Sequence, residues 1–169
     1  MREVRNTQLS DLPKIIDLFE ASIRYQESKK YPVWKNYDKA AIERDILQKN
    51  HYAIFIDSEM AIVFSVCYTD KIIWRALDKG DSIYLHRIVV NPDFKGQKLF
   101  ADILEWSVAH AKAKGLKAVR MDTWAANQNI INYYKAFGFS VIENFTTPNV
   151  PELPVHNRNL ALTLLEYKT

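Results

Sequence analysis

Ile88 to Gly115, IVVNPDFKGQKLFADILEWSVAHAKAKG, is the stretch of sequence that decides the fold. It opens with three apolar β-branched residues, which are typical of the end of a buried strand. Asn91-Pro92-Asp93 ends that strand, because proline cannot donate a hydrogen bond to a sheet. A helical pattern follows, with apolar residues on one face: Leu99, Phe100, Ile103, Leu104, Val108 and Ala111. The stretch therefore predicts a strand, a basic glycine turn and a helix that ends at Gly115.

The turn between that strand and that helix has the character of an anion site. A helix start presents unpaired backbone N–H groups and the positive end of the helix dipole. Lys95 and Lys98 add two positive charges beside Gly96. A phosphate or pyrophosphate is the commonest guest of such a turn, although many strand–helix turns bind nothing. The pattern is neither a Walker loop nor a dinucleotide fingerprint, because the additional glycines are missing.

Composition narrows the class of protein. The chain has 169 residues, 48% apolar and 25% charged, which suits one soluble globular domain over residues 1–169. A net charge of +3 argues against a dedicated nucleic-acid binder. Apolar runs are too short to span a membrane and no signal peptide is expected, so we expect a cytoplasmic protein. Cys67 is the single cysteine and is interpreted as a core residue, and four scattered histidines give no metal-ligand spacing, so no metal is predicted.

The rest of the chain alternates between strand-like and helical periodicity. Residues 70–79 are ambiguous between a strand extension and a short helix. Strands are expected at residues 2–5, 52–56, 60–68, 82–90, 117–123, 139–142 and 160–167, and further helices at 11–23, 38–49 and 127–137. The expected order is β-α-α-β-β-β-α-β-α-β-β, which is an α/β domain.

The segment from Arg24 to Tyr37, RYQESKKYPVWKNY, is expected to be a loop. It carries more aromatic surface than a linker needs, in Tyr25, Tyr31 and Trp34. These side chains either cover the edge of the core or form a wall of a substrate site, and we favour the substrate site because binding residues are often carried on loops.

Two motifs and the element order resemble the GCN5-related N-acetyltransferase (GNAT) family. That family's acetyl-CoA signature is [QR]-x-x-G-x-[GA], and here Lys95 to Phe100, KGQKLF, stands in its register. A second motif, N-x-x-A-x-x-x-Y-x-x-x-G-F, matches Asn127 to Phe139 in its Asn, Tyr, Gly and Phe, with Ile130 in place of the small residue. The resemblance covers nearly the whole chain. It implies a single-domain α/β (α+β) fold with a central mixed, mostly antiparallel twisted sheet of about seven strands, flanked by about four helices.

The resemblance also implies roles for individual residues. The backbone of Ile88, Val89 and Val90 would bind the pantetheine arm of acetyl-CoA. The pyrophosphate would lie on the turn and helix start, which comprise Lys95, Gly96, Gln97, Lys98, Leu99, Phe100 and Ala101. Lys98 and Phe100 replace small residues of the signature, so they could crowd the pyrophosphate, although Lys98 could also contact a phosphate.

The second motif contributes the remaining roles. Asn127 would hydrogen-bond the cofactor arm, and Tyr134 would protonate the CoA thiolate. The general base is open between Asp122 and His86, and each could instead be structural.

The sequence thus predicts an acetyl-CoA-dependent N-acetyltransferase that acts on a primary amine by direct attack in a ternary complex. The acceptor would be a small molecule or a peptide, with no nucleic-acid or membrane partner, and the chain would be a monomer or a homodimer. The alternatives are a non-catalytic acyl-CoA-binding or regulatory domain on the same fold, and a phosphate-binding protein unrelated to CoA.

Overall fold

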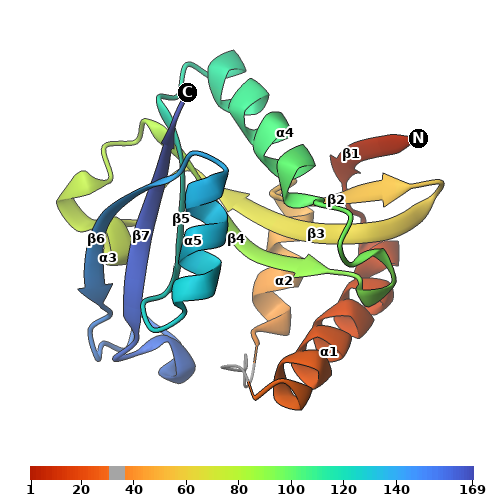
Figure 1. Cartoon of the computed structure of the whole chain (residues 1–169), viewed down its shortest axis with the longest axis horizontal. Helices are drawn as coiled ribbons and strands as arrows, with labels where there is room; N and C mark the ends of the chain where they lie inside the picture. Colours follow the sequence, from red (N-terminus) through yellow and green to blue (C-terminus); the bar gives the residue numbers. More distant parts are fainter. Residues whose placement is uncertain (31–36) are drawn as a thin grey trace. The chain divides into compact units, whose positions relative to one another are not determined.

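The computed structural model describes residues 1–30 and 37–169, which form seven strands and five α-helices (Figure 1). Short 3₁₀ turns lie at Leu9–Asp11, Arg75–Leu77, Pro92–Phe94 and Val155–Asn157. The elements are β1 (Arg2–Asn6), α1 (Leu12–Ser28), α2 (Lys39–Leu47), β2 (His51–Ile56), β3 (Glu59–Cys67), α3 (Lys71–Trp74), β4 (Ser82–Val90), α4 (Phe100–Ala113), β5 (Ala118–Trp124), α5 (Gln128–Ala136), β6 (Ser140–Thr146) and β7 (Ala161–Lys168).

The strands form one seven-stranded sheet in the order β1-β2-β3-β4-β5-β7-β6. β4 and β5 pair in parallel, whereas β1–β2, β2–β3, β5–β7 and β7–β6 are antiparallel. The predicted mixed, mostly antiparallel sheet is therefore confirmed. The fifth helix is α3, which lies in the segment whose pattern was ambiguous.

The chain divides into two compact units, each built from two segments. Residues 1–66 and 87–104 form the first unit, and residues 67–86 and 105–169 form the second. A single domain over residues 1–169 stays a prediction.

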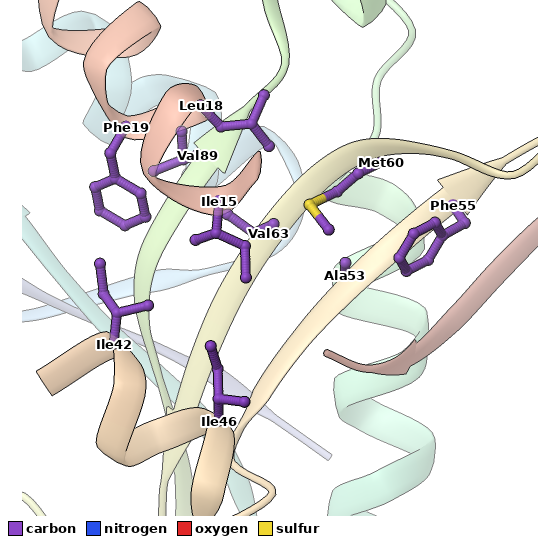
Figure 2. Packing of buried hydrophobic residues seen from close by; sticks show 10 residues of the cluster. All are labelled: Ile15, Leu18, Phe19, Ile42, Ile46, Ala53, Phe55, Met60, Val63 and Val89. Carbon is purple, nitrogen blue, oxygen red and sulfur yellow. The ribbon is translucent and has the colours of Figure 1, made fainter. Parts of the chain in front are cut away.

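The core of the first unit lies between two helices and the strands β2, β3 and β4. α1 buries Ile15, Leu18 and Phe19, which are spaced three and four residues apart and so share one face (Figure 2). α2 begins at an Asp38 cap, whose side chain accepts a hydrogen bond from the Ala41 N–H at 3.0 Å. The full buried cluster is Ile15, Leu18, Phe19, Ile42, Ile46, Ala53, Phe55, Met60, Val63 and Val89.

Leu47 of α2 is apolar yet 61% exposed, because it follows the buried Ile46 directly and so turns about 100° away around the helix. One expectation for the first unit is wrong. Residues 24–28 were expected to begin a loop, but α1 continues to Ser28. No helix breaker occurs before Pro32, so the polar composition of this segment reflects an exposed end of the helix. Tyr31 and Trp34 lie outside the described residues.

The second unit has a smaller buried cluster of Trp74, Tyr84, Leu162 and Leu164. Arg120 of β5 lies against it, donates to Glu166 at 2.8 Å, and places its guanidinium 4.5 Å from the Trp74 ring. No helix within residues 1–30 or 37–169 is long and apolar enough to cross a membrane.

Candidate active site

In the first unit, the turn between β4 and α4 is fixed by a buried asparagine. Asn91 is 5% exposed, and its side-chain amide donates to the Met60 carbonyl at 2.9 Å. Its backbone N–H donates to the Ala61 carbonyl at 2.8 Å, and its Oδ1 accepts from the Asp93 N–H at 3.1 Å. The asparagine thereby ties the beginning of the turn to β3 before the chain reaches Gly96.

Backbone N–H groups of this turn are available to a ligand. Within the described residues, the N–H groups of Gly96, Lys98 and Leu99 donate no hydrogen bond, whereas the Ala101 N–H donates to the Lys98 carbonyl. Gly96 has φ +83° and Lys98 has φ +54°, so left-handed residues flank Gln97. Left-handed residues are a common part of backbone turns that hold an anion. An anion site at this turn stays a prediction.

The two departures from the acetyl-CoA signature have a physical explanation here. Lys98 adopts the left-handed conformation that glycine favours, at the position where the signature has glycine. The Phe100 side chain is 4% exposed and hence lies in the interior, not on the face that the exposed Gly96, Gln97 and Lys98 present. The interior position of the Phe100 side chain does not support the expectation that Phe100 crowds a bound phosphate.

A positive side chain that the sequence interpretation missed lies against the start of α4. Arg2 of β1 pairs with Asp102 at 2.6 Å and donates to the Gln97 carbonyl at 3.5 Å. Asp102 is in the first turn of α4, where its charge would oppose an anion. The ion pair offsets that charge. No spacing in the sequence connects Arg2 with a residue one hundred positions away.

Tyr25 is the one predicted acceptor-site residue that the structure describes. It lies on α1, not on a loop, and the Lys95 Nζ lies 2.9 Å from its ring centroid. A hydrogen bond to Lys95 lowers the pKa of the Tyr25 hydroxyl. Tyr25 is thus associated with the basic turn, and its role toward an acceptor stays a prediction.

The end of β4 carries the residues that were expected to meet the pantetheine arm. Arg87 interrupts the extended strand with φ +52°, and its guanidinium pairs with Asp45 at 2.8 Å. Beyond it, Val89 is buried in the core of the first unit, while Val90 is 36% exposed.

In the second unit, Tyr134 lies on α5 among aromatic rings. Its ring is 5.4 Å from that of Tyr133 and 6.2 Å from that of Phe139, in edge-on arrangements. Burial raises the pKa of the Tyr134 hydroxyl, and the nearby Tyr133 and Asp122 raise it further. The hydroxyl therefore stays protonated at neutral pH, and its role as the proton donor stays a prediction.

The ends of α5 explain two residues of the second motif. The Asn127 Oδ1 caps the helix by accepting from the Ile130 N–H at 3.2 Å, so this oxygen has a structural role in addition to any contact of the side-chain amide with a ligand. Gly138 has φ +100°, and a Cβ there would come within 3.0 Å of the Tyr167 ring. Glycine is consequently required at the end of α5.

Both candidate bases lie in one cluster, together with Asp70, which the sequence interpretation did not single out. One polar atom from each of Asp70, His86 and Asp122 lies within 4.8 Å of the others. The His86 Nε2 is 3.3 Å from the Asp70 Oδ2, and the Asp122 Oδ1 is buried without a hydrogen-bond partner within the described residues. A signal for Asp70 existed, because an aspartate before a short apolar run is a helix cap.

Burial and neighbouring charges shift the pKa values of this cluster. Burial alone would lower the pKa of His86, but the nearby Asp70 and Cys67 and the charge of Asp122 raise it well above its usual value. Burial raises the pKa of Asp122, while the charge of His86 lowers it. The absence of a metal ion at this cluster stays a prediction.

Comparisons with known proteins agree with these features. Residues 20–139 match the family described as Acetyltransferase (GNAT) family. The chain is 25% identical over 141 residues to the uncharacterized N-acetyltransferase MJ1207 of Methanocaldococcus jannaschii; this match covers 80% of the chain and 59% of that relative. The chain thus spans little more than half the length of that curated relative.

Solved structures share the fold. A GNAT-family acetyltransferase from Listeria monocytogenes superposes with a TM-score of 0.82 at 20% identity, covering 99% of this chain and 95% of that one. The putative acetyltransferase yncA from Salmonella typhimurium, solved with its cofactor acetyl-CoA, superposes with a TM-score of 0.68 at 15% identity, covering 99% and 94%. The GNAT family uses acetyl-CoA as its co-substrate.

Proposed function

The chain belongs to the acetyltransferase (GNAT) family, and we propose that it is an acetyl-CoA-dependent N-acetyltransferase that acts on a primary amine. The observation that carries the proposal is the turn after β4. The N–H groups of Gly96, Lys98 and Leu99, which donate no hydrogen bond within residues 1–30 and 37–169, suit a pyrophosphate together with the exposed lysines beside them. This turn has the register of the family's acetyl-CoA signature.

The remainder of the co-substrate would be held by backbone and side-chain donors. Ile88 to Val90 would bind the pantetheine arm as an added strand, and an N–H group there would polarise the thioester carbonyl. The Asn127 side-chain amide would donate to the arm while its oxygen caps α5. Lys95 and Lys98 would supply charge to the phosphates.

The chemistry is a direct transfer in a ternary complex. The nitrogen lone pair of the neutral acceptor amine attacks the thioester carbonyl carbon, the carbon–sulfur bond breaks, and the thiolate takes the Tyr134 hydroxyl proton. A tyrosine whose pKa is raised by burial remains protonated until that moment. The amine's own proton must be accepted by a base, for which Asp122 and His86 are the candidates.

The non-catalytic alternative was suggested by Lys98 and Phe100, which replace small residues of the signature. The interior position of the Phe100 side chain weakens that suggestion for Phe100. A simple CoA binder also has no need of a protonated tyrosine beside an aspartate and a histidine.

The acceptor site is proposed to include Tyr25, Tyr31 and Trp34. Trp34→Ala should raise the KM for the acceptor more than the KM for acetyl-CoA, as expected for a wall that only the acceptor meets. Steady-state kinetics with each substrate varied in turn measures the two constants. Equal changes in both would remove Trp34 from the acceptor site.

Two measurements test the function. Acetyl-CoA at a hundred times its Kd should stabilise the fold by about 2.7 kcal/mol, which for a chain of this size is roughly 5–10 °C in Tm. Incubation with acetyl-CoA and a panel of primary amines, comprising amino acids, diamines and peptides with free N-termini, should release CoA with one class of them. Stabilisation by free phosphate but not by CoA would identify a phosphate-binding protein instead, and stabilisation without CoA release from any amine would favour the non-catalytic domain.

A further inference from the structure

The Asp70 carboxylate is held in one orientation by the segment that precedes α3. Its Oδ1 accepts from the Ile73 N–H at 3.4 Å and so caps the short helix. Its backbone N–H donates to the Asp78 Oδ2 at 2.8 Å, and the Thr69 hydroxyl donates to the same oxygen at 2.7 Å. These contacts leave the Asp70 Oδ2 directed at the His86 Nε2, 3.3 Å away.

The ion pair is sheltered from water. The side chains of Asp70 and His86 are 11% and 26% exposed. At such a site a carboxylate stabilises an imidazolium more strongly than it would at the surface, since solvent screening is reduced. The other groups that face His86 are Cys67, at the end of β3, and Asp122 of β5.

Asp122 also contributes a carboxylate oxygen to this cluster. Its Oδ1, like the Asp70 Oδ2, is buried and accepts no hydrogen bond within the described residues, but the Asp70 oxygen forms the ion pair with His86, whereas the Asp122 oxygen has lone pairs that can take a proton. Burial raises the pKa of Asp122 above its usual value, the neighbouring imidazolium lowers it in part, and the charge of Asp70 raises it again. Asp122 also lies close enough to Tyr134 for its charge to raise the pKa of that hydroxyl.

We propose that Asp70 is a positioning residue that keeps His86 as an imidazolium, and that Asp122 is therefore the base that accepts the proton of the acceptor ammonium. The inference rests on the proposed function and decides between its two candidate bases. In this step the ammonium N–H bond breaks, the proton forms a bond to an Asp122 carboxylate oxygen, and the electron pair stays on nitrogen for attack on the thioester. The second N–H proton, which the nitrogen loses as the amide forms, goes to the Tyr134 oxygen, which has given its own proton to the departing thiolate. His86 takes no proton from the substrate, because it already carries one.

The first test needs no acceptor. Protein labelled with ¹⁵N-histidine is titrated by NMR, and His86→Gln identifies the His86 signals among the four histidines. Wild-type His86 should be an imidazolium at pH 7, and Asp70→Asn should lower its midpoint by about 1–3 pH units, with Asp70→Glu restoring it at least in part. A neutral His86 in the wild type at pH 7 would overturn the inference even if Asp70→Asn failed to fold, and an unchanged midpoint in a folded Asp70→Asn would do the same.

The second test separates the bases by their pH dependence. Ratios of kcat/KM to wild type are measured from pH 6 to 9 with the best amine of the panel. Asp122→Asn should lose about 10²–10⁴-fold throughout. The deficit of His86→Gln should shrink as pH rises, because Asp122 without its imidazolium partner loses its proton at higher pH.

The opposite ranking, with His86→Gln inactive at every pH and Asp122→Asn near wild type, would assign the base to His86 and overturn the inference. The proposed transferase function and the proposed role of Asp70 can fail separately. A wild type without transferase activity would defeat the proposed function and Asp122 as base, whereas the NMR midpoints would still decide whether Asp70 holds His86 as an imidazolium.

Discussion

A negative charge introduced at Gly96 should weaken acetyl-CoA binding by a predictable amount. Gly96 has φ +83°, and a Cβ built there meets no atom within 4 Å, so a side chain would project into open space. Asn and Asp are the non-glycine residues that best tolerate a left-handed backbone, and they have nearly the same shape. A comparison of Gly96→Asp with Gly96→Asn therefore cancels backbone strain and bulk and leaves the charge.

The size of the charge effect follows from Coulomb's law. A carboxylate about 6 Å from one phosphate charge costs about 0.7 kcal/mol in bulk water and about 3 kcal/mol at the effective dielectric of a protein surface. The Kd of Gly96→Asp should consequently be roughly 3- to 150-fold weaker than that of Gly96→Asn. The difference in Kd between the two variants should become smaller with added salt, because exposed charges are screened over about 10 Å at 0.1 M.

Isothermal titration calorimetry with CoA measures both variants directly, at low and high salt. Thermal unfolding of the ligand-free proteins provides the control, since the two variants should have similar Tm values. Equal Kd values for the two variants at low salt would show that no phosphate lies near Gly96, and the turn would lose its proposed role.

Two further predictions concern stability. Lys98 has φ +54°, so Lys98→Gly should stabilise the fold by about 1 kcal/mol, or roughly 2–4 °C in Tm by calorimetry, whereas Lys98→Ala should not; equal Tm values for the two would contradict the backbone explanation. His51 is 0% exposed and burial lowers its pKa to about 4 from 6.5, so its stabilisation is complete above pH 6.5 and is lost as pH falls through 4. The unfolding free energy of the wild type, measured by urea denaturation relative to His51→Asn, should decrease by about 3 kcal/mol between pH 6.5 and pH 4. The same pH dependence of the unfolding free energy in both proteins would contradict this prediction.

Much of the fold was predictable because local signals agreed with each other. The period of the apolar residues gave α1, α2, the β2–β3 hairpin and the strand before the turn, as observed. Asn127 and Gly138 bracket a helix whose cap and positive φ both appear in the structure. At these positions propensity, turn chemistry and burial point the same way.

The sequence-based predictions are wrong or incomplete where contacts between distant residues determine the structure. Helical composition continued α1 past Arg24, and the short α3 could not be told from a strand by its period. Arg2 and Asp70 were missed because their partners, Asp102 and His86, are distant in sequence. The sequence predicts that Phe100 could crowd a phosphate, but the structure places its side chain in the interior.

The most direct test of the central claim compares Tyr134→Phe with Tyr133→Phe. Each substitution removes one hydroxyl from neighbouring rings on α5 and keeps the packing, and Tyr133 is the more exposed of the two. The account predicts that kcat of Tyr134→Phe falls by about 10²–10⁴-fold with the Kd for acetyl-CoA unchanged, while Tyr133→Phe remains near wild type. Full turnover by Tyr134→Phe with the best acceptor would contradict the account.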